Sequence, residues 1–554
     1  MKNLAIRRHA LVLGFFVGYL LLAFRALHLQ VWEGESLEKE GEARYLRVVT
    51  VTPQRGTIFD RRGELLAASS PVESLCASPK DVRATEKGMK ALALALGLPL
   101  DELKKKLSSG RDFAYIARSL TPAQAQKIRA LAVEGFFFRQ EFRRYYPQGE
   151  AAAPLVGITD IDGRGLEGVE LAWNPWLAGK PGKRKLIRDR GGRLVEDLQD
   201  IIPTEEGHDL NLSIDARLQW YTTRILANAV AQNRAHHALA MVVDANTGEV
   251  LAAASFPAYN PNDRGSLTPA KMRHLAFTDL LEPGSTMKPF TIAAALESGV
   301  VHPEEVISTA GGALEVQGKV IHDVHAYPAL TITGIIQKSS NVGAAKVGLL
   351  IPPGMMWTVF SRAGFGKKTF SGFPGEAEGI LRPWKRWRPI EQATMAFGYG
   401  LSMPLARLVE SYTIFANGGK MVPLTLLAGR PHPTWPVVSP KTAETVEKML
   451  EAVVAPGGTG TSAAVGNFRV AGKTGTARKL SGRHYVDAYR SFFTGMVFGR
   501  ERTLLGAVMV DEPQGQYFGG AVAGPVFRQM MEKAVDLLQM VPEKEAERLV
   551  AQAK

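Results

Sequence analysis

The sequence contains a single cysteine, Cys76, among its 554 residues. One cysteine excludes an intrachain disulfide and a thiolate metal cluster. Its apolar neighbours and the absence of an adjacent base predict a buried, unreactive thiol. The histidines lack ligand-like spacing with carboxylates, and the sequence has no internal repeat or low-complexity tract. We therefore expect no metal and no cofactor.

Signatures of nucleic-acid binding are also missing, although the formal net charge is +13. The sequence has no zinc-finger spacing, no aromatic-basic signature of an RNA-binding sheet and no long basic helix. A net positive charge without these modules favours an anionic membrane surface or an acidic polymer as the partner. We therefore expect that the protein binds no nucleic acid. With 45% hydrophobic and 22% charged residues, the chain is globular, and its length predicts two or three folded units.

One apolar stretch, residues 10–32, is long enough to cross a bilayer. Three basic residues precede it: Lys2, Arg7 and Arg8. This charge bias predicts a cytoplasmic tail at 1–9, a single-pass anchor at 10–32 in the cytoplasmic (inner) membrane, and the bulk of the chain on its outer, periplasmic side. A cleaved signal peptide is the alternative, but no small-x-small cleavage site follows. Arg25 interrupts the stretch, and we expect it to snorkel outward or to face a partner.

Two regions that differ in their predicted secondary structure follow the anchor. Residues 33–205 combine strand-like runs at 47–53 and 55–67, helical patterns near 84–110 and 122–133, and a charged β-hairpin at 183–195 that turns at a glycine pair. This mixture predicts an α/β domain, and its charge runs are typical of a solvated face.

The second region, 206–541, predicts an α+β domain with an antiparallel sheet covered by helices. Asp215 is placed to cap a helix, and residues 238–253 predict a hairpin. A largely helical middle occupies 267–455. Strand-like runs at 468–477, 491–498 and 504–511 precede a last helix, which we expect to start at Pro525. A short tail, 542–554, completes the chain.

Ser285 and Lys288 lie three residues apart, on one face of a helix that is predicted to begin after the loop 281–284. Free N–H groups at a helix start can stabilise an oxyanion. A desolvated lysine near other cations loses its proton readily and can act as the general base for a serine hydroxyl. Ser-x-x-Lys alone is weak evidence, because chance supplies it about once or twice in a chain of this length.

Two further motifs follow in order. Ser339 and Asn341 form a Ser-x-Asn triplet, and Lys473, Thr474 and Gly475 lie in a strand-like run. Ser-x-x-Lys, a Ser-x-Asn triplet and Lys-Thr-Gly are the joint signature of penicillin-binding proteins and serine β-lactamases. Their joint occurrence in this order predicts a serine acyl-transfer site.

The sequence resembles the class B penicillin-binding proteins from the anchor almost to its C-terminus. Besides the three motifs, the resembling segments are residues 55–63, 144–147, 165–170, 213–219, 517–520 and 523–527. The resemblance implies a pedestal (dimerisation-like) domain at 33–205 and a penicillin-binding/serine β-lactamase-like transpeptidase domain at 206–541. Residues 282–285, 339–343, 373–376, 387–390 and 397–400 resemble the division (septal) type more than the elongation type. Residues 401–405 depart from the division pattern.

The resemblance implies that this chain catalyses the family's reaction. In that reaction Ser285 is the nucleophile that attacks the peptide bond between the two terminal D-alanines of a peptidoglycan stem. Lys288 accepts its proton, D-alanine leaves, and an amine of a neighbouring stem takes over the acyl group. Ser339 passes a proton to the leaving nitrogen, and Asn341 orients Lys288 and holds the substrate amide. β-Lactam antibiotics acylate the same serine.

The remaining assignments concern the substrate cleft. Lys473 is read as a fixed positive charge that attracts the terminal carboxylate. Thr474 and Thr476 bind that carboxylate, Gly475 lets the substrate backbone approach, and the backbone N–H groups of Ser285 and Thr476 form the oxyanion hole. Tyr517 and Phe518 wall the cleft, with core packing as the alternative for each.

Other functions stay open at this point. A β-lactamase or D,D-carboxypeptidase of the same superfold is one rival, although no Glu-x-x-Leu-Asn segment for deacylation is present. A non-enzymatic scaffold of the wall-synthesis complex is another. By family analogy, the partners are peptidoglycan stem peptides, a SEDS-family glycan polymerase in the membrane and other wall-synthesis proteins. A role of the protein in lateral wall elongation remains the alternative to a role in cell division.

Overall fold

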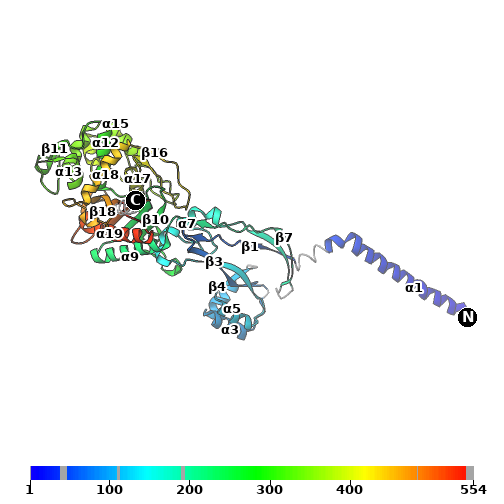
Figure 1. Ribbon diagram of the computed structural model, residues 1–554. Coiled ribbons are helices and arrows are strands. Elements are labelled where there is room, and N and C mark those ends of the chain that lie inside the picture. Colours follow the sequence, from blue (N-terminus) through cyan, green and yellow to red (C-terminus); the bar gives the residue numbers. More distant parts are fainter. Residues whose placement is uncertain are drawn as a thin grey trace, which may run out of the picture. The chain divides into compact units, whose positions relative to one another are not determined.

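The computed structural model describes residues 2–37, 46–80, 82–108, 113–188, 194–482 and 484–543. These residues form two compact units (Figure 1). The first unit comprises Met1–Arg55, Ser70–Arg143 and Ala178–Gly207, and the second comprises Gly56–Ser69, Arg144–Leu177 and His208–Lys554. The predicted domain limits stay a prediction, and most of the predicted tail at 542–554 lies outside the described residues.

The first unit begins with helix α1, Lys2–Leu27, which continues as a π-helical turn at His28–Trp32. The stretch Asn3–Trp32 is apolar and long enough to span a membrane. Arg25 donates to His28 Nδ1 at 3.2 Å and lies 3.6 Å from Glu33 Oε2. The cation that interrupts the apolar run therefore has a counterion at the end of its own helix.

The rest of the first unit contains two groups of strands. β1 (Leu46–Val51), β6 (Gly182–Arg188) and β7 (Leu194–Ile202) form an antiparallel sheet in the order β1-β6-β7. This confirms the predicted strand and hairpin, whose glycine pair lies outside the described residues. From Ser70 onward, β3 (Leu65–Ala77) pairs with β4 (Ala114–Leu120), and β5 (Phe136–Tyr145) also pairs with β3.

Three helices pack in the first unit, at α3 (Glu86–Leu96), α4 (Leu100–Leu107) and α5 (Pro122–Ala130). The helical pattern predicted at 84–110 is thus two helices. Gly97, at φ +67°, ends the first in the left-handed conformation that glycine adopts without strain, and Pro99 precedes the second. Cys76 is fully buried, as predicted.

The second unit is built on a five-stranded antiparallel sheet in the order β10-β9-β19-β18-β17. Its strands are β9 (His237–Asp244), β10 (Val250–Phe256), β17 (Arg469–Ser481), β18 (His484–Phe498) and β19 (Thr503–Asp511). The predicted hairpin and the three predicted strands are confirmed. Within this sheet β17 pairs only with β18, so one of its edges is left for another partner.

Helices cover both faces of this sheet, as predicted. Ala238, Ala240 and Val242 of β9 pack in one core with α9 (Ala216–Asn233) and α19 (Gly519–Leu537), which lie side by side in Figure 1. Leu239 and Met241 pack in the other core, with α12 (Lys288–Glu297), α17 (Leu405–Ala416) and α18 (Pro440–Val454). Successive strand residues point to opposite faces, so a strand buried on both sides is apolar throughout.

Shorter elements complete the second unit. They are β2 (Ile58–Phe59), α6 (Ala153–Val156), α7 (Gly168–Ala172), α8 (Asn174–Leu177), β8 (Leu210–Asn211), α10 (Pro269–Met272), α11 (Leu275–Thr278), β11 (Val306–Ser308), β12 (Ala313–Val316), β13 (Lys319–His322), β14 (Ala329–Thr331), α13 (Ile332–Lys338), α14 (Asn341–Leu350), α15 (Pro353–Arg362), α16 (Pro389–Met395), β15 (Lys420–Met421) and β16 (Trp435–Pro436). The middle region is largely helical, as predicted, but the sequence did not indicate its two-stranded ribbons β11–β14 and β12–β13.

The predicted start of the last helix at Pro525 is wrong. Helix α19 begins six residues earlier, at Gly519, and contains Pro525 in its interior. Its first turns are rich in glycine, which weakens the helical signal in the sequence. Tertiary contacts require these small residues: a Cβ on Gly520 would lie 2.2 Å from Thr459 O, and one on Gly524 would lie 2.2 Å from Ser462 Oγ.

Candidate active site

Ser285 lies in a 3-10 turn, Gly284–Met287, that leads directly into α12. The turn is held from three sides. Gly284 N donates to Gly398 O at 3.2 Å, Thr286 Oγ1 donates to Pro283 O at 2.7 Å, and the Tyr412 hydroxyl donates to Thr286 O at 2.7 Å. The predicted position at a helix start is therefore confirmed, and the serine is presented on a fixed backbone.

Lys288 is fully buried, and its Nζ is surrounded by oxygens. It lies 2.9 Å from Ser285 Oγ, 2.5 Å from Ser339 O, 3.1 Å from Ser339 Oγ and 2.9 Å from Asn341 Oδ1. A neutral amine has two N–H donors and one lone pair. The carbonyl of Ser339 and the amide oxygen of Asn341 can only accept, so they take both donors and leave the lone pair for a hydroxyl proton.

Burial lowers the pKa of Lys288 well below its usual range, because a charged ammonium is poorly solvated in the interior. The charge of Lys473 lowers this pKa further, and the carboxylate of Asp323 opposes the shift. This shift favours the neutral amine that general-base chemistry needs.

The Ser-x-Asn triplet lies at the junction of α13 and α14. Ser339 ends α13 in the left-handed conformation, at φ +60°, and contacts Lys288 through both its carbonyl and its hydroxyl. Asn341 begins α14, and its Nδ2 donates to His322 O at 3.0 Å. This second bond fixes the amide so that Oδ1 faces Lys288.

Lys473 projects from β17 and is fully buried. Its Nζ donates to Ser339 Oγ at 2.9 Å and to Thr474 O at 3.1 Å. Burial lowers the pKa of Lys473 to about 7. The role of this residue as a positive charge that attracts the substrate carboxylate stays a prediction, and the lowered pKa makes that charge dependent on pH.

The motif strand lies against the nucleophile segment through Gly475. A Cβ on this glycine would lie 3.0 Å from Thr286 Cγ2, 3.1 Å from Phe492 Cβ and 3.3 Å from Pro283 O. Contact with the turn that carries Ser285 thus gives a reason for glycine that is separate from the predicted approach of a substrate backbone. The two threonines are already engaged: Thr474 Oγ1 lies 2.8 Å from Thr459 Oγ1, and Thr476 Oγ1 accepts from Gly519 N at 3.0 Å.

Tyr517 and Phe518 border this strand, because Gly519, which binds Thr476, follows them directly. Tyr517 stacks on Tyr489, with ring centroids 4.1 Å apart. Phe518 is 40% exposed, which argues against core packing and leaves its ring free to wall a cleft.

Sequence reasoning missed Asp323. Its carboxylate accepts from Ser340 Oγ at 2.6 Å, from Val342 N at 2.9 Å and from Asn341 N. It therefore caps the start of α14 and fixes the Ser-x-Asn backbone. A lone aspartate sixteen residues before Ser339 carries no local signal of this contact.

Glu282, three residues before the nucleophile, was also missed. Its Oε1 accepts from Gly400 N at 2.7 Å and from the Tyr485 hydroxyl at 3.0 Å, and burial raises its pKa. The Tyr399 hydroxyl accepts from Arg478 N at 3.1 Å and its ring packs edge-on against Tyr485. These contacts tie the β17–β18 hairpin to the segment that bears Ser285.

One group of side chains has metal-ligand proximity in the part of the chain that the structure describes: His236, Asp511 and Glu512. Lys479 pairs with both carboxylates, and Arg490 Nε lies 2.9 Å from Asp511 Oδ1. The protein's own cations thus already neutralise these acids.

Comparisons with known proteins agree with this geometry. Residues 238–532 match the penicillin binding protein transpeptidase domain, and residues 50–212 match the penicillin-binding protein dimerisation domain. The chain is 41% identical to peptidoglycan D,D-transpeptidase FtsI of Escherichia coli K12, over 97% of this chain and 92% of the relative. It is 39% identical to the probable peptidoglycan D,D-transpeptidase PenA of Neisseria gonorrhoeae, over 94% and 91%.

The chain also resembles solved structures of penicillin-binding proteins. The transpeptidase domain of Burkholderia pseudomallei penicillin-binding protein 3 is 42% identical, with a TM-score of 0.55, and the match covers 60% of this chain and 97% of that one. Penicillin-binding protein 3 of Mycobacterium tuberculosis, solved with aztreonam, is 26% identical, with a TM-score of 0.69, over 89% and 97%.

Proposed function

The chain belongs to the class B penicillin-binding proteins of the division type, and on this premise we propose that Ser285 carries its peptidoglycan D,D-transpeptidase reaction. The enzyme is a serine acyltransferase of peptidoglycan synthesis, and a role in septal wall synthesis fits its relatives named FtsI. The observation that carries the residue assignment is the 2.9 Å contact between the fully buried Lys288 Nζ and the Oγ of Ser285, which is only partly buried.

Acylation begins when the Ser285 hydroxyl transfers its proton to the Lys288 lone pair and its oxygen attacks the carbonyl of the penultimate D-alanine. The bond to the terminal D-alanine breaks, and the proton passes from Lys288 through Ser339 Oγ, 3.1 Å away, to the departing amine. The backbone N–H groups of Ser285 and Thr476 are the proposed oxyanion donors. An ester on Ser285 remains.

Deacylation reverses these proton movements. The amine of a second stem loses a proton to Lys288 and attacks the ester carbonyl. The ester bond breaks, and Ser285 Oγ regains a proton from Lys288.

Before acylation, the donor peptide is held by the other residues of the site. Asn341 holds Lys288 and the substrate amide, while Lys473, Thr474 and Thr476 receive the terminal carboxylate of the donor. The unpaired edge of β17 supports binding of the donor as an added strand.

A synthetic stem peptide ending in D-alanyl-D-alanine, offered with and without an amine acceptor, tests this function. A transpeptidase forms the crosslinked peptide in proportion to acceptor concentration. Release of D-alanine with hydrolysis alone would identify a D,D-carboxypeptidase, and fast turnover of a penicillin would identify a β-lactamase. Crosslinking by the Ser285→Ala variant would refute the assignment of the nucleophile and point to a scaffold role for this site.

The chain acts on peptidoglycan and binds β-lactams as its family does, and its N-terminal helix, Asn3–Trp32, is long and apolar enough to cross a membrane. We further propose that its N-terminus is cytoplasmic and its catalytic unit lies outside the inner membrane, because Lys2, Arg7 and Arg8 precede the apolar run. A SEDS-family glycan polymerase is the proposed partner of α1 and of the region 33–205. The limits 33–205 for the pedestal and 206–541 for the transpeptidase domain are proposed with it.

A further inference from the structure

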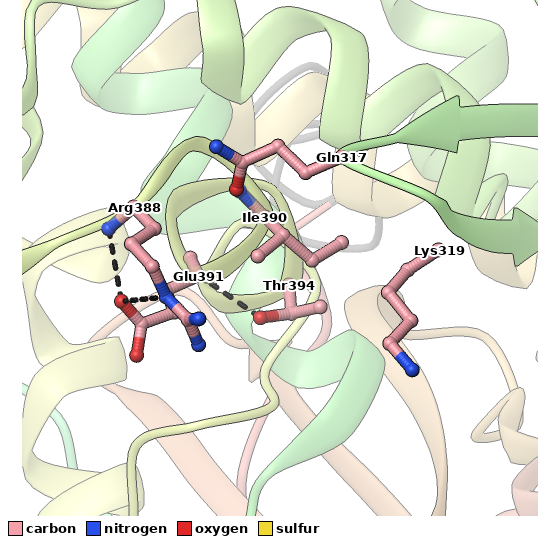
Figure 2. Close-up of a pocket in the computed structure, with 6 residues that line it drawn as sticks. All are labelled: Gln317, Lys319, Arg388, Ile390, Glu391 and Thr394. Carbon is pink, nitrogen blue, oxygen red and sulfur yellow. Dashed lines mark hydrogen bonds and ion pairs between the residues drawn. The ribbon is translucent and has the colours of Figure 1, made fainter.

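A pocket of about 390 Å³ lies between the β12–β13 hairpin and helix α16, and none of the catalytic residues lines it. Its lining residues are Gln317, Lys319, Arg388, Ile390, Glu391 and Thr394 (Figure 2). The mechanism above uses none of them. Five of these six residues carry polar or charged side chains, which can orient a polar ligand in the pocket.

The hairpin wall of the pocket is connected to the Ser-x-Asn triplet. Gln317 and Gly318 form its two-residue turn at φ +51° and +73°, the geometry that suits a tight hairpin. Ile390 N donates to Gln317 Oε1 at 3.4 Å, which joins the hairpin to α16. His322 is three residues beyond Lys319, about 10 Å of strand, and its carbonyl binds Asn341.

The helical wall leads to the nucleophile. Thr394 O accepts from Tyr399 N at 3.1 Å, and the next residues carry Gly398, whose carbonyl binds Gly284 N. Both walls of the pocket therefore end at residues that adjoin Ser285 or Lys288. They belong to the helical part of the second unit, whereas the proposed donor site is the edge of strand β17.

Positive charge prevails in the pocket. Arg382 Nη1 lies 2.7 Å from Glu391 Oε1, and Arg388 binds Glu391 Oε2 through its backbone N at 2.9 Å and its Nε at 3.4 Å. Two arginines thus neutralise the one carboxylate. Lys319 has no ion-pair partner among the residues that the structure describes. Figure 2 shows its side chain on the opposite side of Thr394 from the Arg388–Glu391 pair.

We propose that this pocket is the subsite for the acceptor stem, with Lys319 binding a carboxylate of that peptide. The inference rests on the proposed function, because a transpeptidase needs a second peptide whose amine reaches the acyl-enzyme while its own terminal carboxylate stays free. An anionic peptide anchored at Lys319 has about 10 Å to cover to the Asn341 region, the length of roughly three extended residues. The donor and the acceptor then approach Ser285 from different walls.

The test uses the full chain in detergent with a thioester analogue of the donor and a synthetic acceptor peptide that has one primary amine. The acceptor is offered as its free carboxylate and as its carboxamide. The rate of thioester consumption without acceptor reports acylation. The ratio of acyl transfer to the acceptor over acyl transfer to water reports acceptor binding. The variant is Lys319→Glu, and the matched control is Lys441→Glu, an exposed lysine of α18 that is outside the pocket.

The parent should require about tenfold less of the carboxylate acceptor than of the carboxamide for half-maximal transfer, the effect of one hydrogen bond to a charged group. Lys319→Glu should abolish this preference and lower the ratio of transfer to acylation about tenfold, whereas Lys441→Glu should keep both. A preserved preference in Lys319→Glu, or an equal fall in acylation and transfer, would overturn the acceptor subsite. Failure of the parent itself to form an acyl-enzyme would instead refute the proposed function.

Discussion

The amine nitrogens of Lys288 and Lys473 both lie within hydrogen-bond distance of the Ser339 hydroxyl oxygen, at 3.1 and 2.9 Å. Both lysines are fully buried. Two ammonium groups at one oxygen in the interior repel each other strongly, so the site favours a state with one positive charge. We infer that Lys288 is the neutral member, because its carbonyl and amide acceptors leave its lone pair directed to hydroxyls.

The first prediction concerns pH. Lys473 must be charged to receive the donor carboxylate, and its pKa is lowered to about 7. A group that acts in its protonated form loses that form as pH rises through its pKa. We therefore expect the second-order rate constant for acylation by a penicillin to fall as pH increases above about 7, and stopped-flow measurements between pH 5 and 9 would check this. A rate constant that stays level to pH 9 would contradict it.

The second prediction concerns Asp323, which supports the Ser-x-Asn backbone through three hydrogen bonds. Asp323→Ala leaves buried donors at the start of α14 unsatisfied, at a cost of about 1–3 kcal/mol. We expect acylation by a penicillin to slow about tenfold to a hundredfold.

Asp323→Asn is the matched control, since it can retain hydrogen bonds to the two backbone N–H groups without the charge. It should recover most of the rate. It should also move the acidic limb of the pH–rate profile to lower pH, because the carboxylate of Asp323 raises the pKa of Lys288. Equal rates in parent and Asp323→Ala would show that the cap has no role.

The third prediction concerns Gly475. Gly475→Ala places a Cβ 3.0 Å from Thr286 Cγ2 and 3.1 Å from Phe492 Cβ, so β17 must move away from the nucleophile turn. Overpacking of this kind costs about 1–3 kcal/mol. Thermal unfolding should show a lower Tm, and acylation should slow by more than stability alone explains. Gly482→Ala, at the hairpin tip where a Cβ meets nothing within 4 Å, controls for glycine replacement in the same hairpin, although its φ of +61° adds some strain.

Much of this site was predictable from the sequence. The three motifs predicted that Ser285, Lys288, Ser339, Asn341 and Lys473 would lie together in one site, because each motif has a fixed chemical task. The contacts of Asp323 and Glu282 were not predictable, since they join segments whose proximity only the fold creates. The start of α19 was misplaced for a related reason: glycines that weaken helix propensity are required there by close packing against Thr459 and Ser462.

The fourth prediction concerns stability away from the site. Arg407 and Glu410 form an ion pair that is almost completely buried, and Arg407 Nε also donates to Lys367 O at 3.2 Å. Arg407→Met leaves the Glu410 carboxylate without its counterion, which typically costs about 3–5 kcal/mol. We expect a large loss in Tm.

The double variant Arg407→Met with Glu410→Gln removes the unpaired charge as well and should regain part of the loss. Thermal unfolding of the parent and the two variants gives the comparison. An Arg407→Met variant as stable as the parent would contradict a structural role for the pair.

The central claim is that Ser285 becomes acylated with Lys288 as its base, and intact-protein mass spectrometry after incubation with a penicillin tests it most directly. We expect a stable one-to-one adduct on the parent, mapped by proteolysis to the peptide that contains Ser285. Ser285→Ala should give no adduct, and Lys288→Ala should give one at least a hundredfold more slowly, in line with the contribution of general-base catalysis. An adduct on Ser285→Ala, or on another residue of the parent, would contradict the account.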